Sequence, residues 1–171
     1  STAAGNLQKP VYHQAGSASA THGYSSGGHA PPATFVNTRE KFQMGAEVHS
    51  AYIGSMAQAL NAYTTGESSN THGYISGGVT VSSFNNATAD IEKFSFSSDA
   101  PSVDIADLTV ARIKGSSSSS TTHGYHTGGH TGNPGGAVNN TIDKFAFASD
   151  ANATDVGDMT AAYSGSGSAQ F

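Results

Sequence analysis

Hydrophobic and polar residues alternate with a period of two along short stretches of this chain. The stretch Ile91–Phe96 reads Ile-Glu-Lys-Phe-Ser-Phe, so its two phenylalanines fall on one face and its lysine on the other. Alternation of this kind predicts a half-buried β-strand. The same stretch recurs at Thr141–Phe147 and, more loosely, at Thr38–Met44. We therefore expect an all-β fold.

A second pattern, His-Gly-Tyr-x-x-Gly-Gly, occurs three times, with 50 and then 51 residues between successive histidines. Self-similarity at this period indicates one supersecondary unit copied along the chain. Paired glycines permit positive φ and close backbone approach, so each pair is expected to end a strand in a turn or bulge. The repeat signature comprises His22, Tyr24, Gly27, Gly28, His72, Tyr74, Gly77, Gly78, His123, Tyr125, Gly128 and Gly129.

A partial fourth copy opens the chain. Leu7 lies fifteen residues before His22, just as Leu108 lies fifteen residues before His123. We expect a single β-repeat domain over residues 1–171, because 171 residues fit one domain. Its parts are the tail of a partial unit and three units, at residues 1–20, 21–70, 71–121 and 122–171.

Each unit is expected to hold four short strands. The His-Gly-Tyr segment and the alternating stretch supply two, and the stretches Val103–Leu108 and Thr154–Met159 indicate a third. The fourth falls on serine-rich segments such as Gly115–Thr122, with counterparts at Gly16–Thr21 and Gly66–Thr71. Such a segment is either a flexible linker or a strand whose small side chains pack at a crowded centre.

Composition narrows the range of partners. The formal net charge of −5 argues against nucleic acid, because phosphate binding requires a basic face. The chain has no cysteine, which excludes disulfides and thiol catalysis. No apolar run approaches the length of a membrane span, so we expect no membrane insertion.

The units resemble degenerate kelch repeats. Gly124–Gly129 stands at the double-glycine strand of the kelch pattern, Ile91–Phe94 at the next strand and Leu108–Arg112 at the last segment. The chain lacks the kelch tryptophan, since it contains no Trp. The resemblance implies four-stranded antiparallel blades of a β-propeller. Three units are too few for a propeller, so either two chains complete a ring, or the array is longer, or the fold is a β-trefoil.

The stretch Thr141–Met159 also resembles tandem repeats in tail-fibre and other structural proteins of tailed phages. That likeness implies a structural protein of the virion, assembled as a homo-oligomer or with other virion proteins. It also implies a location in the virion, with a secreted or cell-surface protein as the alternative.

Several residues suggest chemistry, each with a structural alternative. His123, His126 and His130 have the spacing of possible metal ligands, with His22 and His29 in the first unit, but a turn-fixing hydrogen bond is the favoured role. The tyrosines Tyr24, Tyr74 and Tyr125 are possible sugar-stacking contacts or packing residues. Acidic residues recur at positions that suit turns, calcium or glycoside hydrolysis, namely Asp99, Asp104, Asp107, Asp150, Asp155 and Asp158.

No serine–histidine–aspartate order, phosphate loop or nucleotide fingerprint occurs in the sequence. We therefore expect no catalytic residue, metal or cofactor. The leading hypothesis is a non-enzymatic virion protein, of tail-fibre type, that acts in particle assembly or adhesion to a host-surface glycan. A lectin-like carbohydrate-binding module is the alternative, and a hydrolase is a third.

Overall fold

The computed structural model describes residues 5–32, 34–58, 62–80, 86–132, 136–165 and 167–170. Its regular structure within these ranges consists of β-strands without a helix. Sheet 1 contains β1 (Ala15–Ala18), β2 (His22–Ser26), β5 (Thr38–Gln43) and β6 (Ala51–Ser55). Sheet 2 contains β7 (Thr65–Ser68), β8 (His72–Ser76), β9 (Asp90–Ser95) and β10 (Val103–Asp107).

Sheet 3 repeats this order with one addition. It contains β11 (Ser116–Ser119), β12 (His123–Thr127), β13 (Thr141–Ala146) and β14 (Thr154–Asp158), all antiparallel to their neighbours. The last strand, β15 (Ser168–Gln170), pairs in parallel with the inner edge of β11. A two-stranded ribbon of β3 (His29–Ala30) and β4 (Thr34–Phe35) extends from sheet 1.

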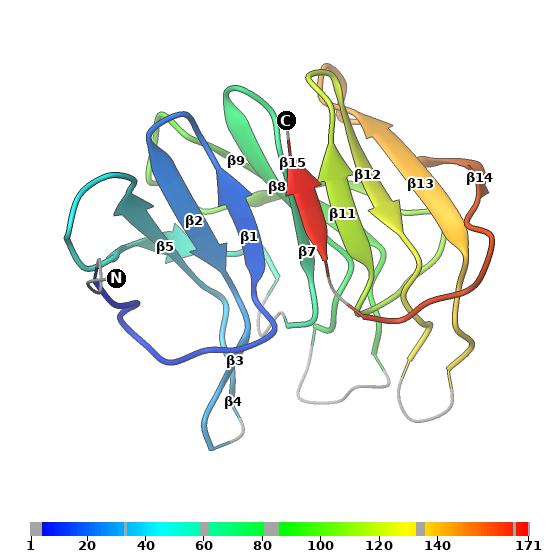
Figure 1. Cartoon of the computed structure of the whole chain (residues 1–171), viewed down its shortest axis with the longest axis horizontal. Helices are drawn as coiled ribbons and strands as arrows, with labels where there is room; N and C mark the ends of the chain where they lie inside the picture. Colours follow the sequence, from blue (N-terminus) through cyan, green and yellow to red (C-terminus); the bar gives the residue numbers. More distant parts are fainter. Residues whose placement is uncertain are drawn as a thin grey trace.

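The three sheets stand side by side, and β7 lies next to both β1 and β11 (Figure 1). These strands approach closely where glycine and serine face the neighbouring strand. A Cβ atom added to Gly66 would lie 2.1 Å from the carbonyl oxygen of Gly16 in the neighbouring sheet. In the next junction Ser117 donates from Oγ to the carbonyl oxygen of Gly66 at 2.9 Å. The serine-rich segments are therefore strands at a crowded centre, and the linker interpretation is wrong.

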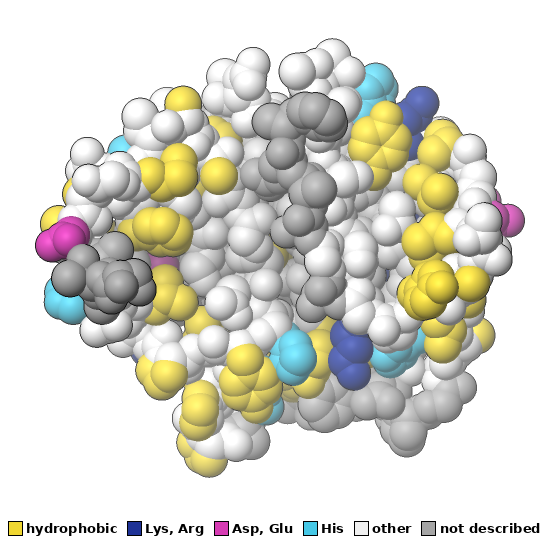
Figure 2. Space-filling model, in the orientation of Figure 1, with side chains coloured by type: hydrophobic (Ala, Val, Ile, Leu, Met, Phe, Trp, Pro, Cys, Tyr) yellow, Lys and Arg dark blue, Asp and Glu magenta, His cyan; other side chains and the backbone are white. Residues whose placement is uncertain are grey.

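The core lies between adjacent sheets. Tyr74 of sheet 2 is 1% exposed and packs with Phe145 and Phe147 of sheet 3. Tyr24 of sheet 1 packs in the same way against the corresponding phenylalanines of sheet 2. The alternating stretches therefore direct their aromatic faces toward the preceding sheet. Figure 2 shows few hydrophobic or charged side chains near the centre of one face, whereas hydrophobic side chains gather toward its two sides.

The expected glycine turns are present. In the second unit Gly77 and Gly78 have φ values of 63° and 107°, which a residue with a Cβ rarely adopts, and they follow β8 directly. The pairs of the first and third units also have positive φ.

The all-β prediction of repeated four-stranded antiparallel units is confirmed, and the arrangement is compatible with kelch-like blades. The expected units were counted from the histidine of each His-Gly-Tyr, but each sheet also includes the strand that precedes this histidine. The strand before each His-Gly-Tyr pairs with it, so β1 within residues 1–20 belongs to sheet 1. Among the described residues, no helix has the length and apolar character needed to cross a membrane.

Candidate functional site

The segment before each His-Gly-Tyr forms the same polar turn in all three sheets. In the second turn Ser69 Oγ accepts hydrogen bonds from the backbone N–H groups of Thr71 and His72 at 3.3 and 3.0 Å. Thr71 Oγ1 lies 2.8 Å from His72 Nδ1. The first turn repeats these distances at Ser19, Thr21 and His22, and the third at Ser120, Thr122 and His123. We call these three segments the serine–histidine turns.

Two adjoining hollows lie among the serine–histidine turns. The first has a volume of about 390 Å³ and is lined by serine and threonine residues of all three turns together with Asn70. The second has a volume of about 480 Å³, and Asn70, His22, His72 and the half-buried Phe96 lie on its wall. Hydroxyl groups and the Asn70 amide therefore line both hollows at one end of the sheets, and imidazole groups line the second.

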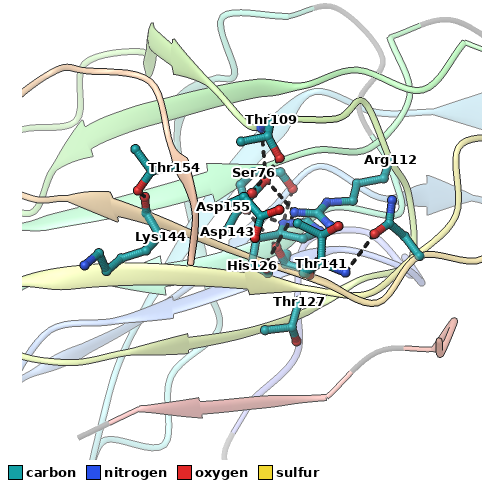
Figure 3. A network of polar contacts seen from close by, with 12 residues as sticks. Ser76, Thr109, Arg112, His126, Thr127, Thr141, Asp143, Lys144, Thr154 and Asp155 are labelled. Carbon is teal, nitrogen blue, oxygen red and sulfur yellow. Dashed lines mark hydrogen bonds and ion pairs between the residues drawn. The ribbon is translucent and has the colours of Figure 1, made fainter. Parts of the chain in front are cut away.

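A separate polar network is buried between sheets 2 and 3 (Figure 3). His126 of β12 is 1% exposed, and its Nδ1 atom lies 3.0 Å from Thr65 Oγ1 and 2.9 Å from Ser76 Oγ. Both hydroxyls also donate to Glu67 Oε1, at 3.2 and 2.8 Å. Burial lowers the pKa of His126 to about 3, with the charge of Arg112 acting in the same direction. Burial raises the pKa of Glu67 to about 8.

An ion pair extends this network into sheet 3. Arg112 and Asp143 are both fully buried, and Arg112 Nη2 donates to Asp143 Oδ2 (Figure 3). Thr109 donates to the same carboxylate from its backbone N–H at 2.9 Å and from its hydroxyl at 2.6 Å. Burial lowers the pKa of Arg112, and the charge of Asp143 opposes that shift. The carboxylate thus joins the end of sheet 2 to sheet 3.

An acidic residue occupies the position of Asp143 in all three sheets, and the sequence analysis did not identify this position as important. Glu92 accepts from the backbone N–H groups of Ala57 and Gln58 at 3.0 and 2.9 Å, and Glu40 accepts from that of Gln8 at 2.8 Å. In each sheet an acid therefore holds the segment that ends the preceding unit. The available signal was an acid two residues before the first phenylalanine of each alternating stretch.

The structure separates the histidines that were considered as metal ligands. His123 belongs to a serine–histidine turn, His126 to the buried network, and His130 is 9% exposed with its Nδ1 2.7 Å from the carbonyl oxygen of Gly132. Among the described residues, no group of three or more His, Asp or Glu side chains is arranged to hold a metal ion. His22 lies in the first turn, and His29 contacts the rings of Tyr12 and Phe35.

The recurring aspartates divide into two groups. Asp99 and Asp150 form ion pairs with Lys41 and Lys93 of the preceding sheet, each at 2.7 Å. Both carboxylates are more than half exposed. The other group lies on the outer strands β10 and β14, where Asp155 accepts from the backbone N–H of Gly157 at 2.9 Å, and it also contains Asp104, Asp107 and Asp158.

The signature tyrosines differ in exposure. Tyr24 and Tyr74 are 4% and 1% exposed in the junctions between sheets, so neither presents its ring face to a ligand from solution. Tyr125 is half-buried on sheet 3. The expected sugar-stacking role is therefore left with Tyr125 alone.

No family model matches this chain, and no curated protein sequence matches it. A solved structure described as "Structure of YjhT" matches 91% of the chain with a TM-score of 0.74 and 10% sequence identity. At this identity the likeness shows the fold alone. The chain spans about half of that structure, 54% of its length.

Proposed function

We propose that this chain is a non-enzymatic adhesion module that binds a surface glycan at the hollows among its serine–histidine turns. The observation that carries the proposal is the recurrence of one turn geometry in three adjacent sheets, with the turns facing shared hollows. Two adjoining hollows built from repeated hydroxyl-bearing turns suit a ligand that is itself a repeating polymer.

The chemistry of the hollows suits a carbohydrate. Serine and threonine hydroxyls both donate and accept hydrogen bonds, and the Asn70 amide does the same, as the hydroxyls of a sugar require. The half-buried ring of Phe96 adds an apolar surface against which a sugar ring can pack. The His72 imidazole is held by Thr71, and burial is the main cause that lowers its pKa. The imidazole of His72 is therefore mainly neutral at pH 7.

Repetition raises the strength of such binding. Each hydroxyl-lined hollow alone would bind a sugar weakly, but a rigid array that engages several residues of one polymer gains avidity without any new contact. The hydrogen-bonded inner strands fix the spacing between turns, since the N–H of Ser68 donates to Ser119 Oγ at 3.0 Å.

The proposed setting is adhesion of a virion to its host, as the likeness of Thr141–Met159 to phage tail-fibre repeats implies. The alternative is a carbohydrate-binding module on a bacterial cell surface. The virion protein and the cell-surface module would use the same glycan site, but they would assemble with different partner proteins. A virion protein should co-purify with a symmetric particle, whereas a cell-surface module should not.

A glycan array followed by titration calorimetry tests the binding. We expect saturable binding of a soluble oligosaccharide, and Asn70→Ala should weaken it at least tenfold because Asn70 lines both hollows. The control is Tyr52→Ala, which removes a 60% exposed ring on β6 and should leave the affinity unchanged. Mass spectrometry of the recovered sugar should show no turnover. Equal affinity of Asn70→Ala and the natural chain would reject the site, and cleaved sugar would reject the non-enzymatic assignment.

A further inference from the structure

Each junction between sheets joins a donor face on one sheet to a recipient face on the next. At the first junction the Tyr24 ring of sheet 1 contacts Phe94 and Phe96 of sheet 2. Lys41 of sheet 1 forms its ion pair with Asp99 of sheet 2 at 2.7 Å. The donor face thus supplies a tyrosine and a lysine, and the recipient face supplies two hydrophobic side chains and a carboxylate.

The second junction uses the same groups one unit later. Tyr74 contacts Phe145 and Phe147, and Lys93 pairs with Asp150. The backbone repeats as well. The N–H of Ser102 donates to the carbonyl oxygen of Ser55 at 3.1 Å in the first junction, and that of Ala153 donates to Asp107 at 2.8 Å in the second. The two junctions are therefore copies of one interface.

Sheet 3 carries a further donor face. Tyr125 and Lys144 occupy the positions of Tyr74 and Lys93, since Tyr125 lies opposite Lys144 across β12 and β13 as Tyr74 lies opposite Lys93. Tyr125 is half-buried, whereas its counterparts are nearly inaccessible. Every residue of the outer strand β14 is exposed, and Val156 on it is 47% exposed. No sheet among the described residues covers this face.

Sheet 1 carries a further recipient face. Phe42 and Met44 occupy the positions of Phe94 and Phe96, and they are 37% and 44% exposed. Together with Leu7 they line a mainly apolar hollow of about 430 Å³. At the internal junctions a buried tyrosine fills the corresponding place. Glu47 follows Phe42 by five residues, as Asp150 follows Phe145.

We propose that sheet 3 of one copy of this chain docks onto sheet 1 of a second copy, through the interface that already joins its own sheets. Tyr125 of the first copy packs against Phe42 and Met44 of the second, and Lys144 meets Glu47. The occupant is a second copy because its donor face matches the recipient face in hydrophobic groups and in charge.

One segment must move for this docking. Gly5–Gln8 already occupies part of the recipient face, because the N–H of Ser50 donates to the carbonyl oxygen of Asn6 at 3.1 Å, as Ser102 donates to Ser55. The end of β14 in the docking copy would take the same place. Leu7 is only half-buried, whereas Met56 and Leu108 at the corresponding positions are 2% and 4% exposed. Gly5–Gln8 is therefore the segment that gives way.

Cysteine cross-linking tests the proposal without relying on glycan binding. The natural chain has no cysteine, so a pair introduced as Lys144→Cys and Glu47→Cys is the only target for a short bismaleimide. The matched control is Lys93→Cys with Asp150→Cys, which should be linked within one chain because those side chains meet at an internal junction. We expect a covalent dimer from the first pair and a linked monomer from the second. A linked control with no dimer from the first pair would overturn the proposal.

Sedimentation equilibrium supplies the second measurement. We expect the mass to rise with concentration from 17.3 kDa toward twice that value. Tyr125→Glu should return it to the monomer, because burying a carboxylate against Phe42 and Met44 is costly, whereas Tyr163→Glu, at a ring 65% exposed beyond β14, should not. A natural chain that stays at 17.3 kDa at every concentration would contradict the docking, as would equal effects of the two substitutions.

Discussion

Tyr74 and Phe147 stack across the junction of sheets 2 and 3, with ring centroids 4.6 Å apart and planes inclined by 19°. Tyr24 and Phe96 stack across the first junction with corresponding values of 4.8 Å and 17°. The repeat therefore preserves the packing between sheets as well as the strands within them. Such aromatic pairs contribute about 0.5–1.5 kcal/mol beyond the burial of their surface.

The glycine of His-Gly-Tyr is required by a phenylalanine on the next strand. A Cβ at Gly73 would lie 2.2 Å from the ring of Phe94, which is 2% exposed and has no room to move. A Cβ at Gly23 would meet Phe42 at the same distance, but that ring is 37% exposed. We expect Gly73→Ala to cost about 2–3 kcal/mol of unfolding free energy and Gly23→Ala clearly less. Urea denaturation measures both, and equal losses would contradict the argument.

The buried pair of Arg112 and Asp143 should be far more sensitive than the exposed pair of Lys93 and Asp150. Asp143→Asn removes the countercharge of a fully buried guanidinium and should lower the unfolding free energy by about 3–5 kcal/mol. The same change at Asp150, which is 52% exposed, should cost less than about 1 kcal/mol. Thermal or chemical unfolding of the two variants provides the comparison. Similar losses would show that Arg112 finds another partner.

Glu67 and His126 should shape the dependence of stability on pH. The pKa of Glu67 rises from its ordinary 4.5 to about 8 in the folded chain, so the folded state holds a proton that the unfolded state has lost, and stability falls as pH rises through this window. The pKa of His126 falls from 6.5 to about 3, so stability is lost as pH falls below 6.5. The two effects oppose each other between pH 4.5 and 6.5.

Of these two groups, only Glu67 changes the unfolding free energy above pH 6.5. The unfolding free energy should therefore decline toward pH 8 by up to about 1.4 kcal/mol for each pH unit. Glu67→Gln keeps the shape of the side chain and removes its titration, so this variant should lose the alkaline decline. The measurement is the difference in unfolding free energy between the variant and the natural chain, in which all other titrating groups cancel. A difference that stays constant from pH 6.5 to 8 would exclude the assignment.

The sequence was sufficient for the repeat, three strands of each unit and the glycine turns, because alternation and paired glycines are local signals. The serine-rich segment stayed open between a strand and a linker, because small polar side chains are compatible with both. Alternation also indicated that Phe94 and Phe96 share a face, but it could not identify the tyrosine of another sheet as their partner. The role of Asp143 was missed for the same reason, since its partner Arg112 comes from a segment 31 residues away that only the packing of sheets brings close. For the serine–histidine turns, the sequence indicated that the histidine lies in a turn. It did not indicate that the hydroxyl of a preceding serine accepts the backbone hydrogen bonds of that turn.

The most direct test of the repeated junction compares Tyr74→Ala with Tyr125→Ala at concentrations where the chain is monomeric. Tyr74 fills an internal junction and Tyr125 occupies the same position on a face that no described sheet of the chain covers. We predict that Tyr74→Ala lowers the unfolding free energy by about 3–5 kcal/mol and Tyr125→Ala by about 1 kcal/mol. Equal losses at the two positions would contradict the account.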